Sequence, residues 1–181
     1  MLPTASYVSS GVWKIILSPI QIKDGQFDLW LPSATARNAS TGFLVSLPET
    51  TLTIPSTACK VITVGAYNSY SDTLAAFSGR GFTWSTDFKK PDLVAPGVDI
   101  ISCAAGGGYS SKTGTSMATP FVTGACALLM EWGIVRENNP YMYGERIKAA
   151  LIQGTRRLPF MSTLPSPEAG WGALCLDFLL E

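Results

Sequence analysis

The residue with the clearest chemical potential in this sequence is Ser116, which lies in the stretch KTGTSMATPFVTGACALLMEW, Lys112 to Trp132. A short polar turn leads there into a segment from Met117 to Met130 that carries no charge and is apolar on every side. Such a segment predicts a helix that is buried rather than amphipathic. Ser116 would then lie at or just before the helix N-terminus, where free N–H groups and the helix dipole favour a developing oxyanion beside the hydroxyl.

Two neighbouring residues are expected to shape this turn. Gly114 supplies the backbone freedom for a tight approach, and Pro120 is expected in the opening turn of the helix, where its missing N–H does little harm. Considered alone, a Thr115–Ser116 pair before an apolar run is most often a helix cap. From these residues alone, Ser116 could be either part of a helix cap or a nucleophile.

The longer string distinguishes the two, because GTSMATP followed by a Val-, Gly- and Ala-rich segment resembles the active-serine motif of the subtilisin-like serine proteases. Four upstream stretches agree in order: PSTACKVITVGAYN from Pro55, LAAFSGRG from Leu74, KPDLVAPGVDI from Lys90, and the approach from Tyr109 to Lys112. The resemblance implies peptide-bond hydrolysis through an acyl-enzyme. It places the nucleophile at Ser116, whose backbone N–H is one oxyanion donor, and supporting motif residues at Gly114, Thr115, Met117 and Pro120.

The sequence contains no histidine. Activation of a serine hydroxyl normally requires a base within hydrogen-bond reach, and in the resembling family that base is a histidine oriented by an aspartate. Neither the Asp motif, the His motif nor the family's oxyanion asparagine in a Gly-Asn context occurs here. We therefore expect this chain alone to be inactive, with catalysis dependent on a missing N-terminal half of the protease.

Two sets of residues in this chain could substitute for the missing groups. Lys112 lies close to Ser116 in sequence and could replace the histidine as base, but an exposed lysine before the turn is the simpler interpretation. Asp92 and Asp99 flank the turn Ala95-Pro96-Gly97 and could serve in acid–base chemistry, although the resemblance makes this stretch structural.

The elements around the serine predict an α/β fold. Val61 to Ala66 is a nearly all-apolar, β-branched run of the kind found in a buried parallel strand. Leu93 to Ala95 and Val98 to Ser102 are expected to form a strand pair or one bent strand around the turn. Tyr143 to Gln153 has apolar residues at helical spacing and predicts an amphipathic helix that ends at Gly154. The resemblance identifies this as the C-terminal part of the subtilisin-like, three-layer parallel-sheet fold.

The first part of the chain has a different pattern. Short β-prone runs at Trp13–Leu17, Phe27–Leu31 and Phe43–Val45 are separated by turn residues, which predicts antiparallel strands. Residues 1–47 are therefore expected to be the end of a β-sandwich, and residues 48–181 the serine-bearing half of a catalytic domain. The later pattern is similar to the clostridial, germination-associated (Csp-type) subtilases, in which a jelly-roll domain is inserted before this half.

Composition limits the partners. Lys plus Arg equals Asp plus Glu at 13 each, so neither nucleic acid nor an acidic membrane is indicated. No apolar run approaches the roughly 20 residues that a membrane span needs. The four cysteines, Cys59, Cys103, Cys126 and Cys175, are far apart and lack metal-ligand spacing, so free thiols and no metal or cofactor are expected.

The N-terminus lacks the pattern of a signal peptide. Localisation rests on the resemblance alone, which suggests a spore-associated or extracellular protein.

Three functions follow from these observations. The first is a fragment of a serine endopeptidase that acts on protein or peptide substrates. The second is a pseudoprotease that binds a partner or small ligand through the old cleft, against which the complete GTSMATP motif argues. The third is a sandwich-type binding module, which rests only on the first 46 residues. A parallel sheet cut midway would also leave an unpaired edge that invites self-association.

Overall fold

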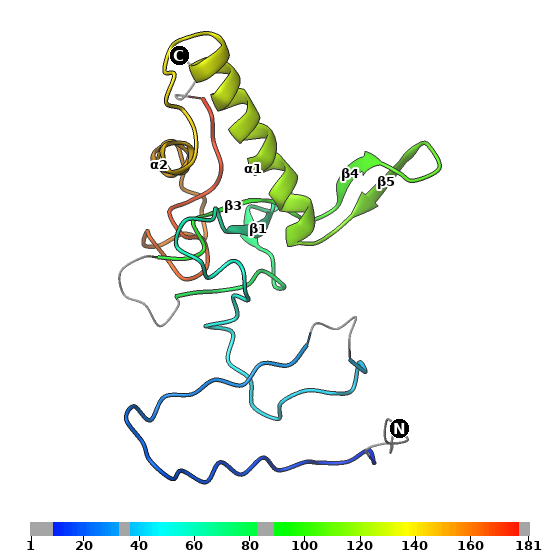
Figure 1. Cartoon of the computed structure of the whole chain (residues 1–181). Coiled ribbons are helices and arrows are strands. Elements are labelled where there is room, and N and C mark those ends of the chain that lie inside the picture. Colours follow the sequence, from blue (N-terminus) through cyan, green and yellow to red (C-terminus); the bar gives the residue numbers. More distant parts are fainter. Residues whose placement is uncertain (1–8, 33–36, 83–88, 178–181) are drawn as a thin grey trace, which may run out of the picture. The chain divides into compact units, whose positions relative to one another are not determined.

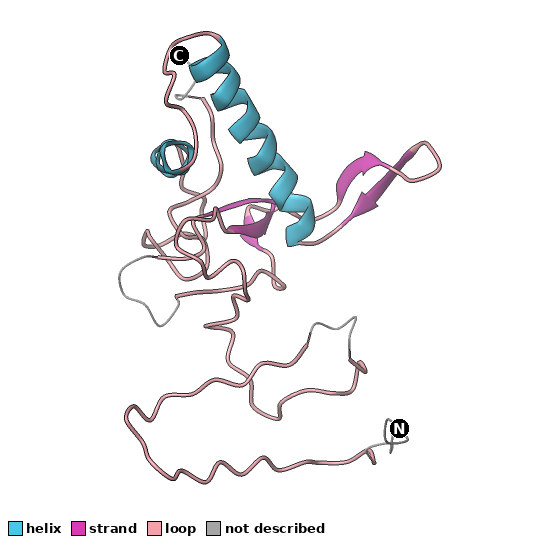
Figure 2. Ribbon diagram, in the orientation of Figure 1, coloured by secondary structure: helices cyan, strands magenta, loops and turns pink. Residues whose placement is uncertain are grey.

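The structure is a computed structural model that describes residues 9–32, 37–82 and 89–177 (Figure 1). The chain divides between Gly42 and Phe43 into two compact units. The described residues of the first unit contain no helix or strand, and neither does Phe43–Val45 at the start of the second; Figure 2 shows these segments as loop. The strands predicted at Trp13–Leu17, Phe27–Leu31 and Phe43–Val45 are therefore wrong for this structure. A strand requires a hydrogen-bonded neighbour, and none is present for these segments in the described residues.

The second unit is built on a small sheet with the strand order β2-β1-β3. β1 (Val64–Asn68) pairs in parallel with β3 (Leu93–Pro96) and antiparallel with the two-residue β2 (Thr73–Leu74). The parallel strand predicted in this region is therefore confirmed, and it begins three residues later than the apolar run. A single bridge from Val94 to Ala173 extends the sheet beyond β3.

The two faces of this sheet are covered by different segments, because successive side chains in a strand point to opposite sides. Ala66, Leu93 and Ala95 belong to a buried cluster with helix α1 (Thr115–Met130) and helix α2 (Glu145–Gln153). Tyr67 and Val94 instead join a second cluster with residues of the C-terminal segment: Leu158, Met161, Ala169 and Ala173. The helix predicted to end at Gly154 is confirmed as α2, with Gly154 as its C-cap.

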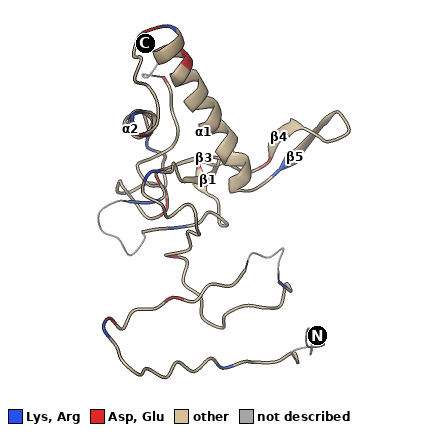
Figure 3. Ribbon diagram, in the orientation of Figure 1, with Lys and Arg blue, Asp and Glu red and all other residues tan. Residues whose placement is uncertain are grey.

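Helix α1 is buried on one side only. Its buried residues recur at helical spacing and face the sheet: Ala118, Val122, Ala125 and Leu129. Phe121, Leu128 and Met130 remain 42%, 47% and 41% exposed. The prediction of a helix buried on every side is therefore wrong for this chain, because no layer of the described residues covers the second face. Helix α1 itself contains no charged residue, and Figure 3 draws most of its ribbon in tan.

By length and composition, the continuous helix Thr115–Val135, which includes the short π-helical segment η2 (Glu131–Val135), could cross a membrane. The expectation that no apolar run approaches that length is corrected by this finding. Such a helix is also what the centre of a folded domain requires, and α1 packs one face against β1 and β3. The expectation that the chain has no membrane partner remains a prediction.

A hairpin formed by β4 (Ile100–Cys103) and β5 (Tyr109–Lys112) makes a separate two-stranded sheet. Its register places Ile100 opposite Lys112 and Cys103 opposite Tyr109. The prediction of a strand pair around Pro96 and Gly97 is therefore wrong: β3 pairs with β1, and β4 pairs with β5. The reason is that the turn between β3 and β4 sends the chain out of the parallel sheet.

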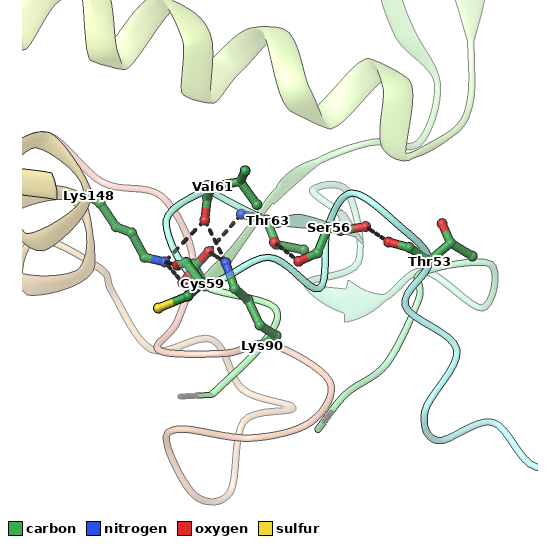
Figure 4. Close-up of polar contacts among 8 residues, drawn as sticks. Thr53, Ser56, Cys59, Val61, Thr63, Lys90 and Lys148 are labelled. Carbon is green, nitrogen blue, oxygen red and sulfur yellow. Dashed lines mark hydrogen bonds and ion pairs between the residues drawn. The ribbon is translucent and has the colours of Figure 1, made fainter. Parts of the chain in front are cut away.

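A buried ion network anchors the chain just before β3 (Figure 4). Asp92 is 2% exposed and receives Lys90 Nζ at 2.6 Å on one carboxylate oxygen and Lys148 Nζ at 2.9 Å on the other. The Thr63 N–H also donates to Asp92 Oδ2 at 2.7 Å. Both ammonium groups donate to the Val61 carbonyl oxygen. Asp92 therefore has a structural role, as the resemblance implied, and joins helix α2 to the start of β1 and β3.

Burial dominates the electrostatics of Lys90. Desolvation lowers the pKa of this ammonium group below its ordinary value of 10.5, and repulsion from Lys148 acts in the same direction. The hydrogen bond and the charge of Asp92 oppose the shift but do not cancel it. The proton on Lys90 is consequently easier to remove in the folded chain than in the unfolded chain.

Candidate active site

Ser116 is the second residue of α1, and its side chain is exposed. In the part of the chain that the structure describes, neither its hydroxyl nor its backbone N–H has a hydrogen-bond partner. Gly114 is the N-cap of the helix, with no side-chain capping bond. Ser116 therefore presents both a hydroxyl and an N–H donor at the positive end of a 16-residue helix. It does not act as a cap.

The turn before Ser116 is held by contacts with the segment after β3. The Gly114 N–H donates to the Gly97 carbonyl oxygen at 2.8 Å. The Asp99 N–H donates to Thr113 Oγ1 at 2.9 Å, and this hydroxyl donates in turn to the Asp99 carboxylate at 3.3 Å. Asp99 thus positions the serine turn, and no geometry here gives it an acid–base role.

Gly114 has the backbone conformation expected of a glycine at a tight turn. Its φ is 154° and its ψ is 164°, values that a residue with a side chain adopts with strain. The N–H of Met117 then donates to the Gly114 carbonyl oxygen at 3.0 Å and closes the first turn of the helix. The tight approach predicted from Gly114 is therefore present.

Pro120 is not in the opening turn, where the sequence placed it. It is the sixth residue of α1, in the second turn, because the helix begins at Thr115. Proline has no N–H, so the Ser116 carbonyl oxygen lacks its ordinary partner four residues later. Nearby, Thr119 Oγ1 donates to the Thr115 carbonyl oxygen at 3.1 Å.

A cavity of about 440 Å³ opens beside Ser116, between the hairpin and the first two turns of α1. It combines residues of three elements: Ile100, Ile101, Ser102 and Cys103 of β4, Ser110 and Lys112 of β5, and Ser116, Met117, Pro120 and Phe121 of α1. The β4 residues were not foreseen as part of the site. Their contribution follows from the pairing of β4 with β5, which the sequence did not predict.

The structure separates the candidate residues into two groups. Ser116, Met117 and Pro120 line the cavity, whereas Gly114 and Thr115 shape the turn and the helix start. Lys112 also lines the cavity, but the described residues show no hydrogen bond between Lys112 and Ser116. The same residues contain no group of three His, Cys, Asp or Glu side chains that could hold a metal ion.

Comparison with known proteins agrees with this geometry. A family profile described as the subtilase family matches residues 39–172. The chain is similar to serine protease AprX of Bacillus subtilis, 37% identical over 125 residues, which cover 58% of this chain and 27% of that protein. It is also similar to a thermophilic serine proteinase of Bacillus sp. (strain AK1), 48% identical over 79 residues, which cover 44% of this chain and 18% of that protein.

Among solved structures, the CspB protease of Clostridium perfringens is similar, with a TM-score of 0.72 and 51% sequence identity over 76% of this chain and 29% of that chain. The chain thus spans less than a third of the length of each of these three relatives. The α/β fold predicted from the resemblance is confirmed by these alignments. Since the family match extends over most of its length, the chain belongs to the subtilase family, peptidase family S8.

Proposed function

We propose that this chain is the serine-bearing part of an endopeptidase that cleaves peptide bonds through an acyl-enzyme on Ser116. The observation that carries the proposal is that the Ser116 hydroxyl and the Ser116 N–H, at the start of α1, have no hydrogen-bond partner in the described residues. Ser116 also lines the cavity. Ser116 Oγ forms a bond to the substrate carbonyl carbon while its proton passes to a base. The N–H donates to the oxyanion that develops on the carbonyl oxygen.

The second half of the reaction completes the cycle. The protonated base gives its proton to the leaving amine as the C–N bond breaks, which leaves an ester on Ser116. Water then attacks this ester, and the serine leaves with a proton returned through the same base. In subtilases this base is a histidine. This chain contains no histidine, so the base must come from outside it.

We further propose that the base, its orienting aspartate and the oxyanion asparagine belong to an N-terminal part of the same protease. Two observations support this. The three relatives above are all more than three times as long as the aligned chain segment. In addition, α1 exposes Phe121, Leu128 and Met130, which a further layer of the catalytic domain would bury.

The proposal extends to the first unit and to the biological setting. Residues 1–47 would be the end of a jelly-roll domain, whose missing strands would cover the eleven exposed apolar side chains from Val12 to Leu31. The similarity to a CspB protease supports protein substrates. It also motivates the proposal of a role in spore germination.

A fluorophosphonate probe tests the nucleophile assignment. The chain alone should react slowly, because loss of a triad member in subtilisin lowers turnover on the order of a million-fold. After addition of the N-terminal part of the protease, Ser116 should be labelled rapidly. Ser116→Ala should abolish both the labelling and the cleavage of a protein substrate, whereas Ser111→Ala, an exposed serine of β5 outside the cavity, should leave both intact.

The alternative of a non-catalytic binder makes the opposite prediction. A reconstituted protein that binds a partner but shows neither Ser116 labelling nor cleavage would be a pseudoprotease. Cleavage that persists in Ser116→Ala would show that another residue is the nucleophile. Either result would overturn the proposed acyl-enzyme.

A further inference from the structure

We propose that Lys112 makes the cavity beside Ser116 a subsite for an acidic side chain of the substrate. The inference rests on the proposed function, since a subsite has meaning only if Ser116 is the nucleophile. It goes beyond that function because it names a substrate preference, glutamate or aspartate near the scissile bond, and the residue that determines it.

The position of Lys112 supports this assignment. It is the last residue of β5, four residues before Ser116, and lines the same cavity. It is the only charged residue among the ten that line the cavity. Figure 3 shows a blue segment on β5 near the start of α1, and Lys112 is the only Lys or Arg of β5. A substrate side chain that occupies this cavity would therefore lie beside this cation.

The charge of Lys112 is not neutralised by the described part of the chain, where none of the ion pairs includes it. The carboxylate nearest along the hairpin is Asp99, which precedes β4 and accepts a hydrogen bond from Thr113. The N-terminus of α1 adds further positive potential at the same cavity. An incoming carboxylate would therefore find an uncompensated cation there.

The rest of the lining suits the same occupant. Ser102 and Ser110 supply hydroxyl donors for the carboxylate oxygens. Ile100 and Met117 offer apolar contacts for the methylene groups of a glutamate. A cavity of about 440 Å³ has room for one such side chain. A purely aliphatic side chain would also contact these apolar residues but would leave the ammonium group unpaired.

Cleavage of matched peptides tests the preference in the active protein reconstituted with its N-terminal part. Pairs of peptides that differ only in Glu or Gln, placed in turn at each position on both sides of the scissile bond, are compared by kcat/KM. At one position, the Glu peptide should be favoured about two- to fivefold, the range for one partly exposed ion pair. Lys112→Gln should remove this preference. Lys60→Gln, which alters an exposed lysine outside this cavity, should retain it.

Cys103 gives an independent test that needs no catalysis, because it is an exposed cysteine and one of the residues that line the same cavity. Its thiolate attacks a methanethiosulfonate, forms a disulfide and releases methanesulfinate. We compare the labelling rates of an anionic and a cationic reagent. The ratio of the two rates is used, because the amount of reactive thiolate is common to both reagents and cancels. Lys112→Gln should lower the anionic-to-cationic ratio at Cys103 about fivefold.

Exposed Cys59 serves as the internal control in the same sample, and its ratio should not change. An unchanged ratio at Cys103 in Lys112→Gln would overturn the inference. So would equal cleavage of the Glu and Gln peptides by a protein whose Ser116 is labelled by the fluorophosphonate, and this result would leave the proposed function intact. If the reconstituted wild-type protein showed neither Ser116 labelling nor cleavage, the proposed function would be overturned, and the subsite with it.

Discussion

The Gly114 N–H donates to the Gly97 carbonyl oxygen at 2.8 Å and so ties the turn before Ser116 to the end of the parallel sheet. A side chain at position 97 would disturb this contact. Its Cβ would lie 2.7 Å from the Ala66 Cβ and 3.0 Å from the Gly114 carbonyl oxygen. The position of the candidate nucleophile thus depends on the absence of a side chain nineteen residues earlier.

Gly97→Ala should therefore destabilise the chain and displace the serine turn. We expect a loss of about 1–3 kcal/mol in the free energy of unfolding, as in other overpacked sites. Labelling of Ser116 in the reconstituted protein should also slow. Gly108→Ala is the control, because a Cβ there meets no atom within 4 Å, although its φ of 75° adds local strain in the hairpin loop. Wild-type stability of Gly97→Ala in urea would contradict the role assigned to this contact.

Thr113→Val should weaken the link between the hairpin and the serine turn, because it removes the hydroxyl that accepts from the Asp99 N–H. The cost in unfolding free energy should be small, about 1 kcal/mol, since the site is exposed. The rate of Ser116 labelling should fall by a larger factor than stability alone explains. Thr123→Val removes a comparable exposed hydrogen bond, to Thr119, and should leave the labelling rate unchanged.

Asp92→Asn should be among the most destabilising single changes in this chain. It leaves two ammonium groups, Lys90 and Lys148, facing a neutral amide in a buried site. Breaking a buried pair in this way costs about 3–5 kcal/mol. Thermal and urea unfolding would measure the loss, and a change below about 1 kcal/mol would contradict the buried network.

Lys90→Met should be far milder than Asp92→Asn. Lys148 would still pair with Asp92, the Thr63 N–H would still donate to it, and the Val61 carbonyl oxygen would keep the Lys148 hydrogen bond. The replacement also removes the cost of burying the Lys90 charge. If Lys90→Met lowered the free energy of unfolding as much as Asp92→Asn, Lys148 alone would not be a sufficient partner for Asp92.

Stability should depend on pH through Lys90. Because burial lowers its pKa in the folded chain below 10.5, the unfolded chain binds more protons than the folded chain in the pH range between the lowered value and 10.5. The free energy of unfolding therefore gains a positive slope with pH in that range and none below or above it. The difference in unfolding free energy between wild type and Lys90→Met should rise with pH there. If this free-energy difference stayed constant or fell as the pH rose, the lowered pKa of Lys90 would be contradicted.

Phe121→Ser tests whether the exposed face of α1 is an interface with the N-terminal part of the protease. The side chain is 42% exposed, so its loss should change the stability of the chain alone only modestly. Association with the N-terminal part should weaken about tenfold, because burial of this ring would no longer contribute. Tyr70→Ser, which is 76% exposed on the turn after β1, is the control. Equal binding by both variants would argue against this face.

Local patterns were sufficient to predict several elements. The apolar run after Ser116 predicted α1, the periodicity before Gly154 predicted α2, and the β-branched run around Val64 predicted a parallel strand. These features depend on hydrogen bonds or side-chain periodicity within a short stretch of chain. The serine motif likewise carried the family, because its residues are adjacent in sequence.

Other features depended on residues that are distant in sequence. Strand pairing assigned β4 to β5 rather than to β3, and the resulting hairpin brought Cys103 and Lys112 to the cavity beside Ser116. The apolar composition of α1 predicted burial on every side, but a helix face is buried only where another segment covers it. The β-prone runs before Gly42 likewise form no strands in the described residues, because a strand also needs a partner.

The sequence by itself therefore determined the family, the candidate nucleophile and the absence of a histidine base. Only the tertiary structure decided that Asp92 joins a buried network with Lys90 and Lys148, and that Gly97 holds the turn before Ser116. The physical reason is that local sequence sets the conformation and chemistry of each segment. Charge neutralisation, close packing and the shape of a cavity are properties of segments brought together by the fold.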